Sequence, residues 1–232
     1  MEKEIKDKMD DRITGAGESG RMITISKITD AYELVRKYKG VIFDLDDTLY
    51  GEKAYVRSGY RKIAAALPQV SDADGKLWRA FENKESAIDS VLHSEGIYTD
   101  ELKDKCLGIY RNQEPDIDFY PGVADMLLKL KAGGCRLGLI TDGRPIAQRA
   151  KIKALGLEEY FDEIIVTDEL GGIEYRKPCS KAFILMKERL AIDYPDLVYI
   201  GDNLSKDFVA PGELGMGAVH FANMDGLYYG MR

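Results

Sequence analysis

The chain has 232 residues, of which 45% are hydrophobic and 31% are charged, so its composition is that of a folded globular protein and not of a disordered one. Its 33 basic residues against 40 acidic ones give a formal net charge of -7, which argues against a general binder of nucleic acid or of anionic membranes. The three cysteines form no C-x-x-C pair, and no apolar signal segment or membrane-spanning stretch is present, so we expect a soluble cytoplasmic protein.

The first part of the chain is polar, and regular structure is predicted only after it. Residues 1–22 are charged and offer little to bury, so we predict a mobile N-terminal tail. Residues 22–25 have an extended pattern, and residues 28–38 have the spacing of a helix. The apolar run Val41-Ile42-Phe43 is typical of a strand that is buried on both faces, as in a parallel sheet.

Residues 51–119 interrupt this pattern with helices that have no strand between them. Ser71 followed by Asp74, and Thr99, are the candidate caps for two helix starts. An insertion directly after a strand's carboxyl end lies above the crevice in which open α/β sheets bind ligands. We therefore predict a helical cap over residues 51–119, with helices over 54–67, 71–84, 85–94 and 99–112.

From residue 120 onward, strands and helices alternate again. We predict helices over 123–131, 145–155 and 180–190, and strands over 136–140, 164–166, 197–200 and 218–221. Such alternation predicts an α/β fold with a doubly wound, mostly parallel sheet and helices on both faces. The catalytic core would then comprise residues 23–50 and 120–232.

Polar residues follow four of the predicted strands. Asp44 and Asp46 come directly after the first buried strand, and period-2 alternation sends both side chains the same way if the chain stays extended. Further along, Thr141 and Asp142 follow the strand predicted over 136–140, and Asp202 and Asp207 follow the strand predicted over 197–200. Lys177 lies in the loop beyond the strand predicted over 164–166. Carboxylates gathered at one sheet edge need a cation between them or a proton on one of them.

These residues, in this order and spacing, resemble the four motifs of the haloacid dehalogenase (HAD) superfamily. The motifs are Asp44-x-Asp46-x-Thr48, Thr141, Lys177, and Gly201-Asp202 with Asp207 five residues later. The resemblance spans residues 41 to about 222, and the insertion is similar to the helical cap of phosphoglycolate phosphatase-like and acylneuraminate phosphatase-like members. It implies a Rossmann-like core and a HAD-like phosphatase.

The resemblance also implies a cofactor and a covalent route. Asp44 would attack phosphorus to give an aspartyl-phosphate, and Asp46 would act as general acid and then as general base. The cofactor would be Mg²⁺, held by the carboxylate of Asp44, the backbone carbonyl of Asp46 and the carboxylate of Asp202. Asp207 would orient the waters on the metal or the side chain of Lys177.

The remaining motif residues would bind the phosphoryl group. The Thr141 hydroxyl and the next backbone N–H groups, beginning at Asp142, would hold its oxygens. Lys177 would neutralise charge on the nucleophile and on the transferring group. Arg57 and Arg144 are weaker candidates for substrate contact, and for Arg57 a solvated helix face is the favoured interpretation.

The second aspartate favours hydrolysis of a phosphomonoester over dehalogenation, because an alkoxide leaving group needs a proton and a halide does not. The expected partner is a small phosphorylated metabolite, with no nucleic acid and no membrane. Two alternatives stay open: a phosphomutase of the β-phosphoglucomutase type, and a non-catalytic binding or scaffold subunit with the same fold. The identity of the substrate and the oligomeric state are not predicted.

Overall fold

The computed structural model describes residues 22–227, and six parallel strands form a single sheet within that range. The strand order is β1-β6-β5-β2-β3-β4. The strands are β1 (Ile23–Ile25), β2 (Gly40–Phe43), β3 (Arg136–Thr141), β4 (Glu163–Val166), β5 (Leu197–Gly201) and β6 (Gly217–Phe221). The predicted doubly wound parallel sheet is confirmed. The predicted tail over 1–22 lies outside the described residues except for Met22.

Alternating residues of the central strand β2 face two different helical layers. Val41 and Phe43 pack in one apolar cluster with side chains from α2 (Ala31–Val35), α7 (Val123–Ala132) and α8 (Pro145–Ala154). Ile42 packs in the opposite cluster with side chains from α9 (Lys181–Leu190) and α10 (Val209–Leu214). Because both faces are covered, every residue of β2 is buried.

The register of the central strands brings their carboxyl ends to the same level. Phe43 in β2 is paired with Leu139 in β3 on one side and with Ile200 in β5 on the other. The N–H of Asp44 donates a hydrogen bond of 2.8 Å to the carbonyl of Ile200. The residues that follow these strands therefore meet at one edge of the sheet.

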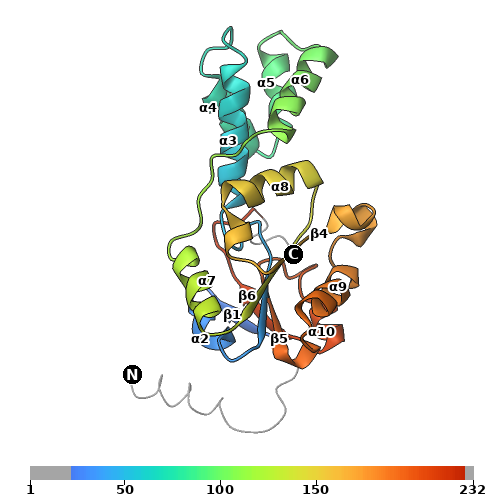
Figure 1. Ribbon diagram of the computed structural model, residues 1–232. Helices are drawn as coiled ribbons and strands as arrows, with labels where there is room; N and C mark the ends of the chain where they lie inside the picture. Colours follow the sequence, from blue (N-terminus) through green and yellow to red (C-terminus); the bar gives the residue numbers. More distant parts are fainter. Residues whose placement is uncertain (1–21, 228–232) are drawn as a thin grey trace.

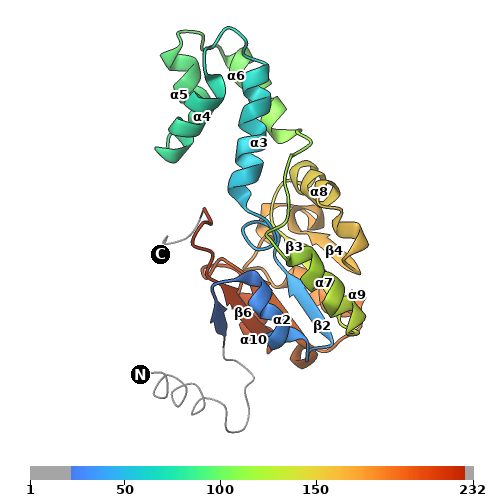
Figure 2. The same cartoon turned by 90° about the vertical axis from the view of Figure 1, so that its left-hand side faces the viewer.

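Four helices between β2 and β3 form a separate bundle beyond this edge (Figures 1 and 2). They are α3 (Glu52–Ala65), α4 (Ala73–Glu82), α5 (Ala87–Ser94) and α6 (Asp100–Arg111). Ile63, Leu77 and Leu92 are fully buried in an apolar cluster built from the bundle's own residues. We call these four helices the cap.

Of the two capped helix starts predicted for the cap, the one at Thr99 is confirmed and the one at Ser71 is wrong. Thr99 precedes α6, and its hydroxyl accepts a hydrogen bond of 3.1 Å from the N–H of Leu102, as a capping threonine does. Ser71 does not cap α4. The helix begins at Ala73, after Asp72 has taken a left-handed backbone with a φ of 53°, and no side chain caps it.

Smaller elements complete the described range. Short 3₁₀ turns occur at Ile28–Asp30, Leu157–Glu159, Thr167–Leu170, Ile173–Tyr175 and Tyr194–Asp196. The six-residue helix α10 was not predicted, because it is too short to show a clear helical period. Within residues 22–227, no helix has both the length and the apolar character that crossing a bilayer requires.

Candidate active site

Lys177 connects the ends of the central strands. It lies in the loop after β4, and its side chain is fully buried. Its Nζ is 2.6 Å from Oδ1 of Asp44, 2.9 Å from Oδ1 of Asp207 and 2.8 Å from the hydroxyl of Tyr199. Burial lowers the pKa of Lys177, but the charges of Asp207 and Asp44 outweigh burial and hold the pKa well above its ordinary value. The ammonium is therefore retained and neutralises part of the negative charge beside it.

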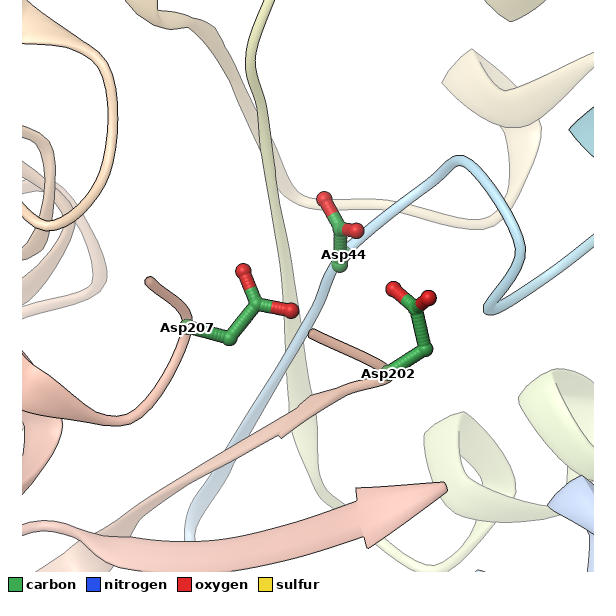
Figure 3. A group of neighbouring side chains, drawn as sticks. All are labelled: Asp44, Asp202 and Asp207. Atoms are coloured by element: carbon green, nitrogen blue, oxygen red, sulfur yellow. The ribbon is translucent and has the colours of Figure 1, made fainter. Parts of the chain in front are cut away.

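Three carboxyl groups share the space next to this ammonium. Asp44 follows β2, Asp202 follows β5, and Asp207 comes from the loop beyond; each offers an oxygen that lies within 4.8 Å of the oxygens from the other two. Figure 3 shows the carboxyl groups of Asp207 and Asp202 on either side of that of Asp44. Oxygen-only donor sets of this kind suit a hard divalent cation such as Mg²⁺.

Asp44 and Asp202 have raised pKa values in this environment. Burial, followed by repulsion from Asp44 and Asp207, raises the pKa of Asp202 to about 8. Burial also raises the pKa of Asp44, to about 7, although Lys177 opposes it. A divalent cation between the oxygens would favour the charged forms of both groups. The three oxygens and these raised pKa values together fit a metal site.

Asp207 is held in place by its neighbours. Its Oδ2 accepts a hydrogen bond of 2.9 Å from the N–H of Asn203. A Cβ at Gly201 would lie 2.4 Å from the same oxygen, which is closer than atoms can approach, so only glycine fits the end of β5. Asp207 thereby reaches both Lys177 and the other two carboxylates.

The side chain of Asp46 interacts with a different set of partners. Lys151 Nζ donates to its Oδ1 at 2.7 Å, Gln148 Nε2 donates to its Oδ2 at 2.9 Å, and the hydroxyl of Tyr50 also donates to Oδ1. Burial raises the pKa of Asp46, but the charge of Lys151 and these hydrogen bonds outweigh burial, so the pKa is lowered overall. Asp46 is ionised in this arrangement.

Thr141 and Asp142 differ in their access to the site. Thr141 is fully buried, and its hydroxyl accepts a hydrogen bond from Gln148. Both carboxylate oxygens of Asp142 are used: Oδ1 accepts from the Thr167 hydroxyl at 3.0 Å and from the backbone N–H of Lys177, and Oδ2 accepts from Lys206 at 3.1 Å. The Asp142 side chain thus connects the loop after β3 to the loops after β4 and β5.

The site opens into a cavity of about 390 Å³ at the junction of core and cap. Its walls carry charges of both signs, from Asp44, Asp46, Glu52, Asp142, Gly143, Gln148, Lys151, Arg176, Lys177, Asp202, Asn203 and Lys206. Burial, followed by repulsion from Asp46, raises the pKa of Glu52 to about 8. A cavity of this size and polarity suits a small, charged ligand.

A sequence profile of the haloacid dehalogenase-like hydrolase family matches residues 41–220. The chain belongs to this family. A glyceraldehyde 3-phosphate phosphatase from Methanocaldococcus jannaschii is 31% identical to it over 198 residues, which cover 77% of the present chain and 82% of that protein. An (S)-2-haloacid dehalogenase from Pseudomonas putida is 23% identical over 73% of this chain and 78% of that one. The predicted superfamily and the prediction of a HAD-like phosphatase are confirmed at this level.

Solved structures agree with this assignment at the level of the fold. A HAD-hydrolase from Bacillus subtilis, whose crystal structure is bound to magnesium, has a TM-score of 0.58 and 22% identity to the present chain. The superposition covers 78% of this chain and 85% of that one. The present chain therefore shares its fold with that protein.

In this family member, the structure does not bring the two weaker substrate candidates into the cavity. Arg57 on α3 pairs with Asp74 at 2.8 Å, and its guanidinium lies 5.0 Å from the centre of the Trp78 ring. Neither Arg57 nor Arg144 is among the residues that line the cavity. Arg57 is therefore a structural residue of the cap here, and its role in substrate contact is not supported by its position.

Several residues of the site were missed by sequence reasoning. Gln148 and Lys151 are three residues apart in a predicted helix, so they share a face, and that helix starts at the predicted crevice. This spacing was a usable indication. Glu52, Arg176 and Lys206 also line the cavity, but nothing in the sequence distinguishes them from neighbouring surface charges.

Proposed function

We propose that the protein is a Mg²⁺-dependent phosphohydrolase that cleaves a small phosphomonoester through an aspartyl-phosphate on Asp44. The observation that carries this proposal is the position of the Asp44 carboxylate. Its Oδ1 is bonded to the buried ammonium of Lys177, beside the carboxylates of Asp202 and Asp207, while Asp46 lies two residues away on the cavity wall. The residues to which we assign the roles of nucleophile (Asp44), charge-neutralising lysine (Lys177), metal ligand (Asp202) and acid–base group (Asp46) all line one cavity.

The two chemical steps can be written with this chain's own residues. In the first, Asp46 takes up a proton from solvent before the step and gives it to the ester oxygen, while Asp44 forms a bond to phosphorus and the bond from phosphorus to that oxygen breaks. In the second, Asp46 takes a proton from a water that attacks phosphorus, and the bond to Asp44 breaks to release phosphate. Lys177 balances negative charge on Asp44 and on the phosphoryl oxygens throughout.

Asp44, Asp202 and the backbone carbonyl of Asp46 would hold Mg²⁺, with Asp207 ordering the metal's surroundings. The bound ion would supply positive charge for the phosphoryl oxygens and for the carboxylates that otherwise repel one another. The raised pKa values of Asp44 and Asp202 support this proposal, because they indicate a site that lacks positive charge without a ligand.

For the substrate, we propose a phosphorylated sugar or triose. The relative from Methanocaldococcus jannaschii carries the name glyceraldehyde 3-phosphate phosphatase, and the small cavity suits a ligand of a few carbon atoms. Asp46 and Glu52 on the cavity wall offer oxygens that can form hydrogen bonds with the hydroxyl groups of such a substrate.

Release of inorganic phosphate tests the proposal directly. The purified protein with Mg²⁺ should hydrolyse 4-nitrophenyl phosphate and members of a sugar phosphate panel that includes glyceraldehyde 3-phosphate. Removal of the metal with EDTA, or the variant Asp44→Asn, should abolish turnover. Asp193→Asn is a matched control, because the Asp193 side chain is 82% exposed and lies on the surface.

Two outcomes would replace the proposal. If phosphate moves between positions of a sugar while little free phosphate is released, the protein is a phosphomutase. If wild type is inert across the panel, and Asp44→Asn still binds whatever partners wild type binds, the fold serves as a binding or scaffold subunit.

A further inference from the structure

The side chain of His220 on β6 contacts the peptide group that follows Asp202. Its Nε2 lies 3.1 Å from the backbone carbonyl oxygen of Asp202. Because a carbonyl can only accept a hydrogen bond, Nε2 carries the hydrogen and donates it. His220 is only 9% exposed, so this bond satisfies a polar group that has little access to water.

The same peptide group is held at its other end. The N–H of Asn203 donates a hydrogen bond of 2.9 Å to Oδ2 of Asp207. The peptide unit is planar, so bonds at both its carbonyl and its N–H fix its rotation relative to Asp202. On the preceding side, the chain is held in the sheet by β5, which ends at Gly201. The direction in which the Asp202 side chain leaves the backbone is therefore fixed from both sides.

His220 is itself oriented by the edge strand β1. Its Nδ1 lies 3.4 Å from the hydroxyl of Thr24, which is paired with His220 in the parallel register of β1 and β6. The ring of Phe208 lies edge-on to the imidazole, with the ring centres 5.8 Å apart. The imidazole thus has a partner at each nitrogen and an aromatic ring against it, and these contacts limit its rotation.

The strand that orients His220 lies outside the region shared with the family. The family match covers residues 41–220, so it includes His220 but not Thr24. In this chain β1 adds a strand at the edge of the sheet, beside β6. A chain of hydrogen bonds therefore runs from this added strand through His220 to Asp202.

We propose that His220, oriented by Thr24, is a positioning residue that holds Asp202 in the direction required to bind Mg²⁺. This inference rests on the proposed function, because it takes Asp202 as a ligand of the metal. Loss of a hydrogen bond that supports a metal ligand commonly costs about 10- to 100-fold in metal affinity. Without the donor on His220, the peptide after Asp202 could rotate, and the carboxylate would point toward the metal site less often.

Metal binding tests the inference without any turnover. Carboxylate and carbonyl oxygens suit both Mn²⁺ and Mg²⁺, so the Kd for Mg²⁺ can be measured by displacing Mn²⁺ and following the EPR signal of free Mn²⁺. His220→Phe keeps an aromatic ring without a donor, and it should raise the Kd for Mg²⁺ about 10-fold or more. His220→Gln keeps an N–H donor for the Asp202 carbonyl, and it should recover part of the affinity.

Two further variants complete the experiment. Thr24→Val should raise the Kd by a smaller factor, because the donor on His220 stays and only its orientation is loosened. Val219→Ala is the matched control, since Val219 is the neighbour of His220 on β6 and is buried in the apolar cluster of the other face. It should lower the melting temperature of the metal-free protein through a lost core contact, and it should leave the Kd unchanged.

An unchanged Kd in His220→Phe would overturn the inference, and so would an equal rise in Kd in Val219→Ala, which would mean that metal affinity follows stability alone. Thr24→Val keeps the test decisive if His220→Phe does not fold, because an unchanged Kd there would contradict the link from β1 to Asp202. Failure of the proposed function has a different signature. Wild type would then bind no Mg²⁺, or would bind it and hydrolyse none of the phosphomonoesters.

Discussion

The charged groups of the core and those of the cap are paired at similar distances but in very different surroundings. In the core, Lys177 approaches Asp44 to 2.6 Å, and the side chains are 0% and 6% exposed. In the cap, Arg57 approaches Asp74 to 2.8 Å, with side chains that are 30% and 33% exposed. By distance alone, the two ion pairs would be expected to contribute similarly to stability. Burial separates them, because solvent screens the cap pair and leaves the core pair unscreened.

The two regions also differ in what a charge is used for. The buried charged side chains of the core face a cavity. Apolar side chains in their place could not carry out the proposed reaction. The half-exposed charges of the cap surround an apolar cluster that already holds the helices together. We therefore expect substitutions at core charges to cost both stability and activity, and substitutions at cap charges to cost little of either.

Lys177→Met should give the largest effect. It leaves Asp44 and Asp207 buried without their shared cation, so the free energy of unfolding should fall by about 3–5 kcal/mol, and turnover should be lost. Urea unfolding monitored by circular dichroism measures the first effect. Adding Asp207→Asn should recover part of the stability, because one of the two repelling charges is removed. A loss below about 1 kcal/mol would place this pair with the surface pairs of the cap.

Leu77→Ala should be the most damaging change in the cap. Leu77 is fully buried in the cap's own cluster, so truncation should lower the free energy of unfolding by about 2–5 kcal/mol. If the cap is held by its own apolar contacts, amide hydrogen exchange should speed up in α3–α6 and stay nearly unchanged in the sheet. Equal acceleration in both regions would mean that cap and core unfold as one unit.

Added Mg²⁺ should stabilise the protein more at pH 9 than at pH 7. The pKa of Asp44 is raised from 3.8 to about 7 and that of Asp202 from 3.8 to about 8, so the folded state holds protons that the unfolded state has released. The free energy of unfolding of the metal-free protein therefore falls as the pH rises toward 8, and the full loss is present above that pH.

Mg²⁺ binds the charged carboxylates and competes with these protons, so it should return more of the stability at pH 9. Saturation at a hundredfold excess over Kd corresponds to about 2.7 kcal/mol. Thermal unfolding with Mg²⁺ and with EDTA at both pH values measures the difference. Asp202→Asn should abolish it, and an equal Mg²⁺ effect at the two pH values would contradict the proposed ligands.

The pair between Arg57 and Asp74 should give the smallest effect. A double-mutant cycle with Arg57→Met and Asp74→Asn should yield a coupling of about 0.2–1 kcal/mol, because both side chains are partly solvated. The kcat/KM of Arg57→Met should equal that of wild type. A selective rise in KM would show instead that Arg57 leaves Asp74 and binds substrate when the cap moves.

Much of the fold was predictable because its patterns are local. Consecutive apolar residues marked β2 as a strand buried on both faces, and the Thr99 hydroxyl was recognised as a cap before α6. The positions of Asp44, Thr141 and Asp202 at strand ends followed from the alternation of strands and helices, because parallel strands end at one edge. The start of α4 was predicted wrongly, since the left-handed backbone at Asp72 depends on how the preceding turn packs.

The partners of individual side chains were not predictable in this way. Lys151 lies 105 residues beyond Asp46 in the chain, and only the packing of α8 against the loop after β2 brings them together. The same holds for Arg57. Its sequence pattern indicated an exposed basic helix face, but in the structure it contacts Asp74 and Trp78 of α4. Side-chain direction depends on the neighbours that fill the surrounding space.

The amino-acid sequence by itself determined the strand and helix pattern, the family motifs and the edge of the sheet where they meet, because each of these follows from short-range periodicity and from chain order. The tertiary structure alone decided which charges are buried, which carboxylate faces Lys177 and which faces Lys151. Burial and charge pairing are sums over residues distant in sequence, and they set the pKa values on which the proposed chemistry depends.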